Sequence, residues 1–253
     1  MNRAKAVAVV GYKDSGKTRV VEALIRELTG RGLKVGTLKH TAEDTPLDTP
    51  GKDTWRHRKA GSKAAAILHE KGAALFLDRH LTVTEAANLL GNVDLIVLEG
   101  FKSLKTVARI VVPKNQEDLD ALTSELNIAV VDLTVEGLEP SPGIPTVTLD
   151  QAKELSDIVD QRAFPMLPGL DCHGCGYDSC REMAKAIMDG RASPDGCATF
   201  SPGFRLRVDG EEVSMGTFVR DITRNVVLGL LRSLKGVGTP GRVELEFEVE
   251  EDG

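Results

Sequence analysis

The chain has 253 residues, of which 41% are hydrophobic and 28% are charged, a composition typical of one globular domain of ordinary size with smaller additions. Its net charge of -6 and its pI of about 5.5 argue against a general nucleic-acid-binding protein, whose surface is usually basic. No apolar run approaches the ~20 residues that cross a bilayer, and the N-terminus shows no signal-peptide pattern, so we expect a cytoplasmic protein.

An apolar strand predicted at Ala4 to Val10 leads into a glycine-rich turn and then into a helix. The turn, Gly11 to Thr18, fits the phosphate-binding pattern G-x-x-x-x-G-K-[ST] at every fixed position. The helix has one apolar face, because Val20, Leu24 and Leu28 recur at helical spacing. Phosphate binding needs a strand, a turn and a helix in this order, as predicted here. The alternative interpretation of the segment is a glycine turn that binds no ligand.

The turn carries groups suited to phosphate and magnesium. Gly11 and Gly16 allow successive backbone N–H groups to converge on an anion, and the helix N-terminus adds partial positive charge. Lys17 would reach the outer phosphates and take part in catalysis, and the Thr18 hydroxyl would hold Mg²⁺. The residues predicted to bind the phosphates are Gly11, Asp14, Ser15, Gly16, Lys17 and Thr18.

The second predicted strand, Leu33 to Leu38, ends beside two further candidate residues. In an open α/β sheet the carboxyl ends of the strands form the ligand edge, so His40 is a catalytic candidate, with a structural or solvated histidine as the alternative. Asp53 follows a polar loop and could contact Mg²⁺ or water, or could simply cap the short helix predicted at Trp55 to Gly61. Two small apolar strands are predicted next, at Ala64 to Leu68 and Ala73 to Leu77.

A short helix is predicted at Thr84 to Leu90 with Thr84 as its N-cap, and a near-continuous apolar strand follows from Asp94 to Glu99. An acid at the carboxyl end of a buried strand next to the phosphate loop can complete the Mg²⁺ shell. Glu99 is placed for that role together with Thr18, and Asp94 is the weaker candidate. A surface or helix-capping carboxylate is the alternative interpretation of Glu99.

Strands and helices then alternate to the end of the first predicted domain, residues 1–163. The strands are expected at Ala108 to Val112, Ile128 to Val131 and Thr146 to Leu149, and the helices at Glu117 to Leu126 and Gln151 to Arg162. This order predicts an α/β fold of the P-loop NTPase type, with a mainly parallel sheet covered on both faces.

Four cysteines lie close together in a second predicted domain, residues 164–202: Cys172, Cys175, Cys180 and Cys197. Without a secretion signal they are poor candidates for a disulfide framework and suggest one metal site. Three thiolates within nine residues and a fourth after a helix suit a [4Fe–4S] cluster. Tetrahedral zinc is the alternative, although zinc ligands usually form two separated C-x2-C pairs.

The remaining residues, 203–253, are predicted to form a small α+β cap. A hairpin joins Phe204 to Val208 with Glu211 to Val213 through an Asp-Gly turn. A helix with a wide apolar face runs from Phe218 to Leu234, and an alternating strand is expected at Arg242 to Val249. The apolar helix face suggests a dimerisation element, hence a homodimer.

Four motifs in the first domain occur in a fixed order: V-V-G-Y-K-D-S-G-K-T, V-G-T-L-K-H, P-G-K-D-T-W-R-H-R-K-A-G and V-D-L-I-V-L-E-G-F-K. Together they resemble the molybdopterin-guanine dinucleotide biosynthesis protein B family of P-loop GTP-binding proteins. The segment L-P-G-L-D-C-H-G-C-G-Y-D-S-C with Cys197 resembles the small four-cysteine iron–sulfur domain of corrinoid iron–sulfur proteins and electron-transport subunits.

The resemblance implies an adaptor that binds GTP with Mg²⁺, hydrolyses it weakly, and assists a molybdopterin guanylyltransferase or a molybdopterin-bearing protein in molybdenum or tungsten cofactor synthesis. It also implies that Lys39, His40, Asp53 and the segment Gly100 to Lys102 belong to the ligand face. GTP rather than ATP rests on the resemblance alone, because the chain has no N-K-x-D motif. The alternatives are an iron–sulfur electron-transfer or scaffold protein whose nucleotide switches partner docking, and a small-molecule kinase.

Overall fold

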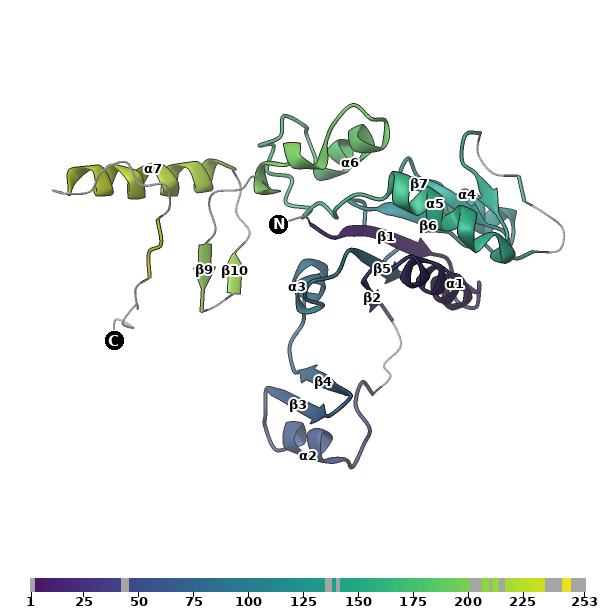
Figure 1. The fold of residues 1–253 in the computed structure, drawn as a ribbon, viewed down its shortest axis with the longest axis horizontal. Coiled ribbons are helices and arrows are strands. Elements are labelled where there is room, and N and C mark those ends of the chain that lie inside the picture. Colours follow the sequence, from purple (N-terminus) through teal and green to yellow (C-terminus); the bar gives the residue numbers. More distant parts are fainter. Residues whose placement is uncertain are drawn as a thin grey trace.

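The computed structural model describes residues 3–41, 46–134, 138–139, 142–200, 206–209, 211–213, 217–234 and 243–246. Its central element is a six-stranded sheet of order β2-β5-β1-β6-β7-β8 in which all neighbouring strands are parallel, as the sequence predicts (Figure 1). The strands are β1 (Lys5–Val10), β2 (Val35–Lys39), β5 (Leu95–Glu99), β6 (Ala108–Val111), β7 (Asn127–Val131) and β8 (Thr146–Val147).

Helices cover both faces of this sheet. Side chains of β1 alternate between two cores: Val7 and Val9 pack on the side of α1 and α5, and Ala6, Ala8 and Val10 pack on the side of α3 and α4. The covering helices are α1 (Lys17–Gly30), α3 (Val83–Leu89), α4 (Gln116–Leu122) and α5 (Ala152–Arg162). Burial on both faces explains why the strands have continuous apolar sequences.

Several element ends differ from the sequence predictions. Helix α3 is capped by Thr82 and not by Thr84, because the Thr82 side chain and Glu85 form a reciprocal capping box. Helix α4 ends at Leu122, four residues earlier than predicted, since Thr123 has an extended backbone. Strand β8 stops at Val147, and a 3₁₀ turn at Leu149–Gln151 precedes α5.

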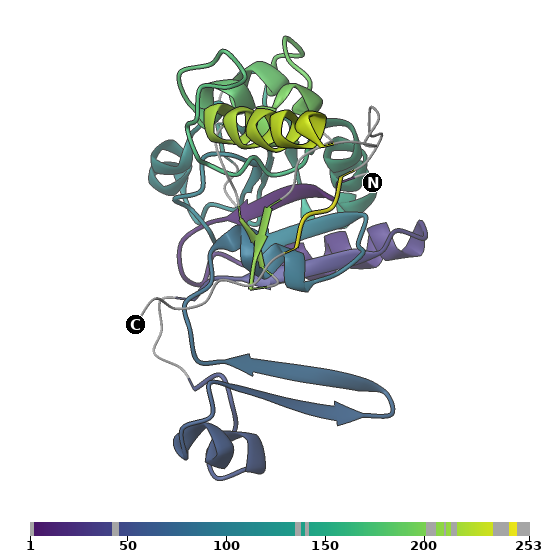
Figure 2. The ribbon, with the colours of Figure 1, turned by 90° about the vertical axis from the view of Figure 1, so that its left-hand side faces the viewer.

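A separate lobe follows β2. It consists of α2 (Asp53–Lys59) and the antiparallel strands β3 (Ala64–His69) and β4 (Gly72–Leu77), which pair with each other and not with the main sheet. Figure 2 shows this lobe projecting below the main body. The N-cap of α2 is Lys52, so the alternative interpretation of Asp53 as a cap is wrong.

The cysteine segment and the C-terminal residues follow α5. The segment contains α6 (Cys180–Met188) and 3₁₀ turns at Pro194–Gly196 and Ala198–Phe200. A hairpin of β9 (Leu206–Val208) and β10 (Glu211–Val213) and helix α7 (Thr217–Ser233) come next. The strand predicted at Arg242 to Val249 is wrong for residues 243–246, which are not in a strand, and its other residues lie outside the described part, as do Phe204 and Arg205.

Among the described residues, no helix combines the length and apolarity needed to span a membrane.

Candidate functional site

The turn between β1 and α1 is closed so tightly that it depends on its glycines. An added Cβ at Gly11 would lie 2.4 Å from both Ser15 Oγ and the Val112 carbonyl oxygen. Gly16, immediately before α1, has a φ of 87°, in the left-handed region that favours glycine, and Asp14 has a φ of 59°. The Ser15 hydroxyl is buried and has no hydrogen-bond partner within the described structure. A buried donor without a partner inside a glycine-rich turn fits a site for phosphate oxygens.

The two side chains predicted to hold Mg²⁺ are in contact. Thr18 Oγ1 donates a 2.9 Å hydrogen bond to Glu99 Oε1, although the residues are 81 positions apart in the chain. Glu99 ends β5 beside β1 and is 9% exposed. A hydroxyl and a carboxylate at this position fit the oxygen ligands of Mg²⁺. The weaker candidate, Asp94, precedes β5 at its other end, where its carboxylate accepts a 2.7 Å hydrogen bond from Lys34 N.

Lysine side chains lie beside Glu99 and beside Tyr12 of the phosphate turn. Lys39 Nζ lies 3.0 Å from Glu99 Oε1, and Lys17 Nζ donates to the Tyr12 carbonyl oxygen. Burial lowers the pKa of Lys17, nearby Glu99 opposes this change, and the charges of Lys102 and Lys39 lower the pKa further. The Lys102 ammonium lies 4.1 Å from the centre of the Tyr12 ring. Three ammonium groups, of Lys17, Lys39 and Lys102, together with the carboxylates of Glu99 and Asp14 leave an excess of positive charge that suits a ligand with several negative charges.

His40 lies at the same edge of the sheet, and Asp53 does not. His40 N donates a 3.0 Å hydrogen bond to the Glu99 carbonyl oxygen, and its ring lies 5.4 Å from the ring of Phe101. Gly100, with a φ of 95°, lets the chain pass close to the His40 carbonyl. Asp53 is exposed at the start of α2, in the projecting lobe. The catalytic roles of both side chains stay predictions.

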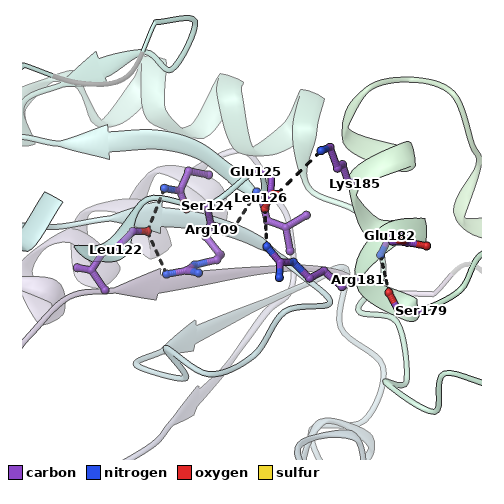
Figure 3. A network of polar contacts seen from close by, with 10 residues as sticks. Arg109, Leu122, Ser124, Glu125, Leu126, Ser179, Arg181, Glu182 and Lys185 are labelled. Atoms are coloured by element: carbon purple, nitrogen blue, oxygen red, sulfur yellow. Dashed lines mark hydrogen bonds and ion pairs between the residues drawn. The ribbon is translucent and has the colours of Figure 1, made fainter. Parts of the chain in front are cut away.

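The cysteine segment joins the sheet at the amino ends of the strands, opposite the phosphate turn. Ala6 N donates to the Phe164 carbonyl oxygen and Leu167 N to the Thr106 carbonyl oxygen, each at 3.0 Å. Figure 3 shows Arg181 and Lys185 of α6 directed at Glu125, which precedes β7, with N···O distances of 2.9 and 3.9 Å. The segment therefore packs on the amino edge of the sheet.

All four cysteines are free thiols, and Cys180 and Cys197 are buried in the core shared with α1 and α5. Backbone N–H groups of Asp171, Gly169 and Leu170 are hydrogen-bonded to the Cys180 thiol. Burial raises the pKa of this thiol, and these hydrogen bonds act in the opposite direction. Four thiols suit an iron–sulfur cluster by residue type. Within the described ranges, however, no three His, Cys, Asp or Glu side chains are arranged as ligands of a single ion, so the structure does not bring the four cysteines together as one ligand set.

Comparison with known proteins gives the family to which this fold belongs. Residues 6–133, more than half of the chain, match the model of the family MobB, molybdopterin guanine dinucleotide synthesis protein B. The chain belongs to the MobB family. The crystal structure of Bacillus subtilis MobB is similar, with a TM-score of 0.55 and 28% identity, covering 62% of this chain and 97% of that chain.

Curated relatives of this MobB-family chain include a full-length match. A "Putative molybdopterin-guanine dinucleotide biosynthesis adapter protein" of Methanocaldococcus jannaschii is 28% identical over 250 residues, 97% of this chain and 98% of the relative. A "Probable molybdopterin-guanine dinucleotide biosynthesis adapter protein" of Bacillus subtilis is 28% identical over 159 residues, 61% of this chain and 91% of the relative. Residues 167–198 match a second family model, described as "Putative Fe-S cluster".

Within this MobB-family fold, the sequence interpretation missed two contacts. The ion pair of Lys39 with Glu99 follows from strand register, because the two residues are direct partners on neighbouring parallel strands. Strand order cannot be read from local patterns, so no sequence signal pairs them. The contact of Arg181 with Glu125 joins segments 56 residues apart and has no motif of its own.

Proposed function

We propose that the chain is a GTP-binding adapter of molybdopterin guanine dinucleotide synthesis that hydrolyses GTP weakly and carries a [4Fe–4S] cluster. Its partner is a molybdopterin guanylyltransferase or a molybdopterin-bearing protein. The chain divides into a nucleotide domain (residues 1–163), a cluster domain (164–202) and a C-terminal domain (203–253). The choice of GTP and of the pathway rests on membership of the MobB family and on the named relatives.

The observation that carries the nucleotide assignment is the Thr18–Glu99 hydrogen bond of 2.9 Å next to the glycine-rich turn. The turn would bind phosphate oxygens through backbone N–H groups and the Ser15 hydroxyl, with Lys17 beside them. Thr18 and Glu99 would hold Mg²⁺, which would neutralise charge on the phosphates. His40 lies at this edge and is proposed to act on the terminal phosphate. Asp53 lies in the projecting lobe, so its proposed role requires this lobe to move toward the site.

Calorimetric titration with GTP and MgCl₂, and separately with ATP, tests the nucleotide assignment. We expect GTP to bind the wild type, and Lys17→Ala to lose at least about 100-fold in affinity because a partly buried charge-assisted contact is removed. Lys34→Ala is the matched control, since Lys34 is exposed and directly precedes β2, at the end of this strand that lies away from the phosphate turn. A wild type that binds no GTP, or a Lys17→Ala variant that binds like the control, would overturn the assignment.

The cluster assignment is tested by anaerobic reconstitution followed by iron, sulfide and zinc analysis. We expect iron and sulfide in equal amounts, and a loss of both in Cys180→Ser, because this thiol is buried and hydrogen-bonded to the backbone. Asp195→Asn, an exposed position two residues before Cys197, is the control that keeps all four thiols. Zinc without sulfide in the wild type would contradict the assignment.

A second function is favoured by the position of the cysteine segment on the amino edge of the sheet, away from the phosphate turn. An electron-transfer or scaffold role would use the cluster for an external partner, with the nucleotide controlling docking. A reversible redox titration with turnover by a partner protein would support it. A cluster that shows no redox transition would refute the electron-transfer role.

We also propose a homodimer through α7. Its apolar side chains Phe218, Ile222, Val226 and Leu230 are between 50% and 78% exposed and lie on one helix face. Sedimentation equilibrium tests this proposal, and a monomer at all concentrations would refute it.

A further inference from the structure

The carboxylate of Glu99 already has a cation beside it in the structure. Glu99 Oε1 accepts the Thr18 hydrogen bond at 2.9 Å and lies 3.0 Å from the Lys39 ammonium. Both contacts are made to the same oxygen atom. The Lys39 ammonium therefore competes for the place where a metal ion held by Thr18 and Glu99 would bind.

The two partners differ in their freedom to move. The Glu99 side chain is 11% exposed. Glu99 is the last residue of β5, which lies between β1 and β2, so its backbone is held in position. The Lys39 side chain is 62% exposed, at the last residue of β2. A long exposed side chain can leave this contact at small cost, because a solvated ammonium keeps its hydration. An arriving cation would displace Lys39 and leave Glu99 in place.

The surrounding charge disfavours a divalent cation by itself. Lys17 still interacts electrostatically with Glu99 after Lys39 has moved, and Lys102 and Asp14 act on Lys17 as well. A divalent cation would then add two positive charges to this set of charges. The phosphate chain of a nucleotide supplies several negative charges and removes that repulsion. The released Lys39 ammonium would lie at the same edge as this phosphate chain.

We propose that Lys39 is an internal substitute for Mg²⁺, neutralising Glu99 in the empty site and pairing with the terminal phosphate when Mg²⁺ enters. The inference rests on the proposed nucleotide site. It makes Lys39 a ligand-binding residue that neutralises Glu99 while the site is empty. Mg²⁺ and the nucleotide then bind together, and the nucleotide keeps part of its affinity when no Mg²⁺ is present.

The test uses the full chain, with Lys39→Gln, Lys39→Arg and the control Lys34→Gln. Mn²⁺ binding without nucleotide is measured by electron paramagnetic resonance, and GTP binding is measured by calorimetry in EDTA and in MgCl₂. In Lys39→Gln we expect Mn²⁺ to bind at least about tenfold more tightly, and GTP in EDTA about tenfold more weakly, than in the wild type. Lys39→Arg keeps the charge and should behave like the wild type in both assays.

The proposal would be overturned if Lys39→Gln and Lys34→Gln had the same affinity for Mn²⁺ and the same affinity for GTP in EDTA, with unchanged melting temperatures. Tight Mn²⁺ binding by the wild type without nucleotide would also overturn it. If the wild type binds no GTP in MgCl₂, the nucleotide assignment fails. The Mn²⁺ measurement then still decides whether Lys39 occupies the cation position at Glu99.

Discussion

The phosphate turn leaves no room for a side chain at position 11, and Gly11→Ala therefore tests the description of the site. An alanine Cβ would lie 2.4 Å from Ser15 Oγ and from the Val112 carbonyl oxygen, whereas ordinary contact begins at 3.4 Å. The Val112 backbone is held in place because its N–H donates to Val10 O at 2.8 Å. Overpacking costs about 1–3 kcal/mol, and weakening this hydrogen bond costs about 1 kcal/mol more.

We expect a melting temperature about 4–16 °C below that of the wild type, and at least tenfold weaker GTP binding because Ser15 and the turn are displaced. Circular dichroism on heating and calorimetry measure these effects. Gly30→Ala is the matched control: nothing lies within 4 Å of its added Cβ, and alanine favours the helix that this residue ends. If Gly11→Ala melts and binds GTP like Gly30→Ala, the close approach described here does not exist.

Three further substitutions test the docking of the cysteine segment and the capping of α3. Met183→Ala should lower the free energy of unfolding by about 2–5 kcal/mol, because this side chain is 1% exposed in the shared core; a loss below about 1 kcal/mol in urea unfolding would contradict this packing. Glu125→Gln should cost less than about 1 kcal/mol and only at low salt, because its ion pairs are partly exposed; a larger, salt-independent loss would refute this expectation. Hydrogen bonds from Arg79 and Thr82 lower the pKa of Glu85 from 4.5 to about 2, so the stability that Glu85 contributes is complete above pH 4.5 and is lost as the pH falls toward 2. The stability of Glu85→Gln, measured as the pH is lowered, should lack this part of the pH dependence. An acid unfolding transition identical to that of the wild type would contradict the stabilising role of Glu85.

Local sequence patterns were sufficient for the phosphate turn. The apolar run of β1, the spacing of Gly11 and Gly16 and the amphipathic α1 are contiguous in the chain, so their arrangement follows from short-range geometry. Glu99 was also predictable, because a carboxylate at the end of a fully buried strand must lie at the ligand edge. The parallel sheet followed from the alternation of strands and helices.

Long-range arrangement was not predictable in the same way. The pairing of Lys39 with Glu99 depends on β2 lying beside β5, and the hydrophobic pattern of either strand does not specify its neighbour. The strands β3 and β4 look like other apolar strands in sequence, yet among the described strands they pair with each other and with none of the main sheet. The capping box at Thr82 has a local sequence signal, T-x-x-E, but the N-cap of this helix was predicted two residues later, at Thr84.

The parallel strands place the phosphate turn and the cysteines on opposite edges of one sheet. A protein that docked against the cysteines would approach from the side of the strand amino ends, and this would leave the proposed nucleotide site at the carboxyl ends accessible to a second protein. The fold can therefore bridge two proteins in one ternary complex, with the length of a β-strand between them.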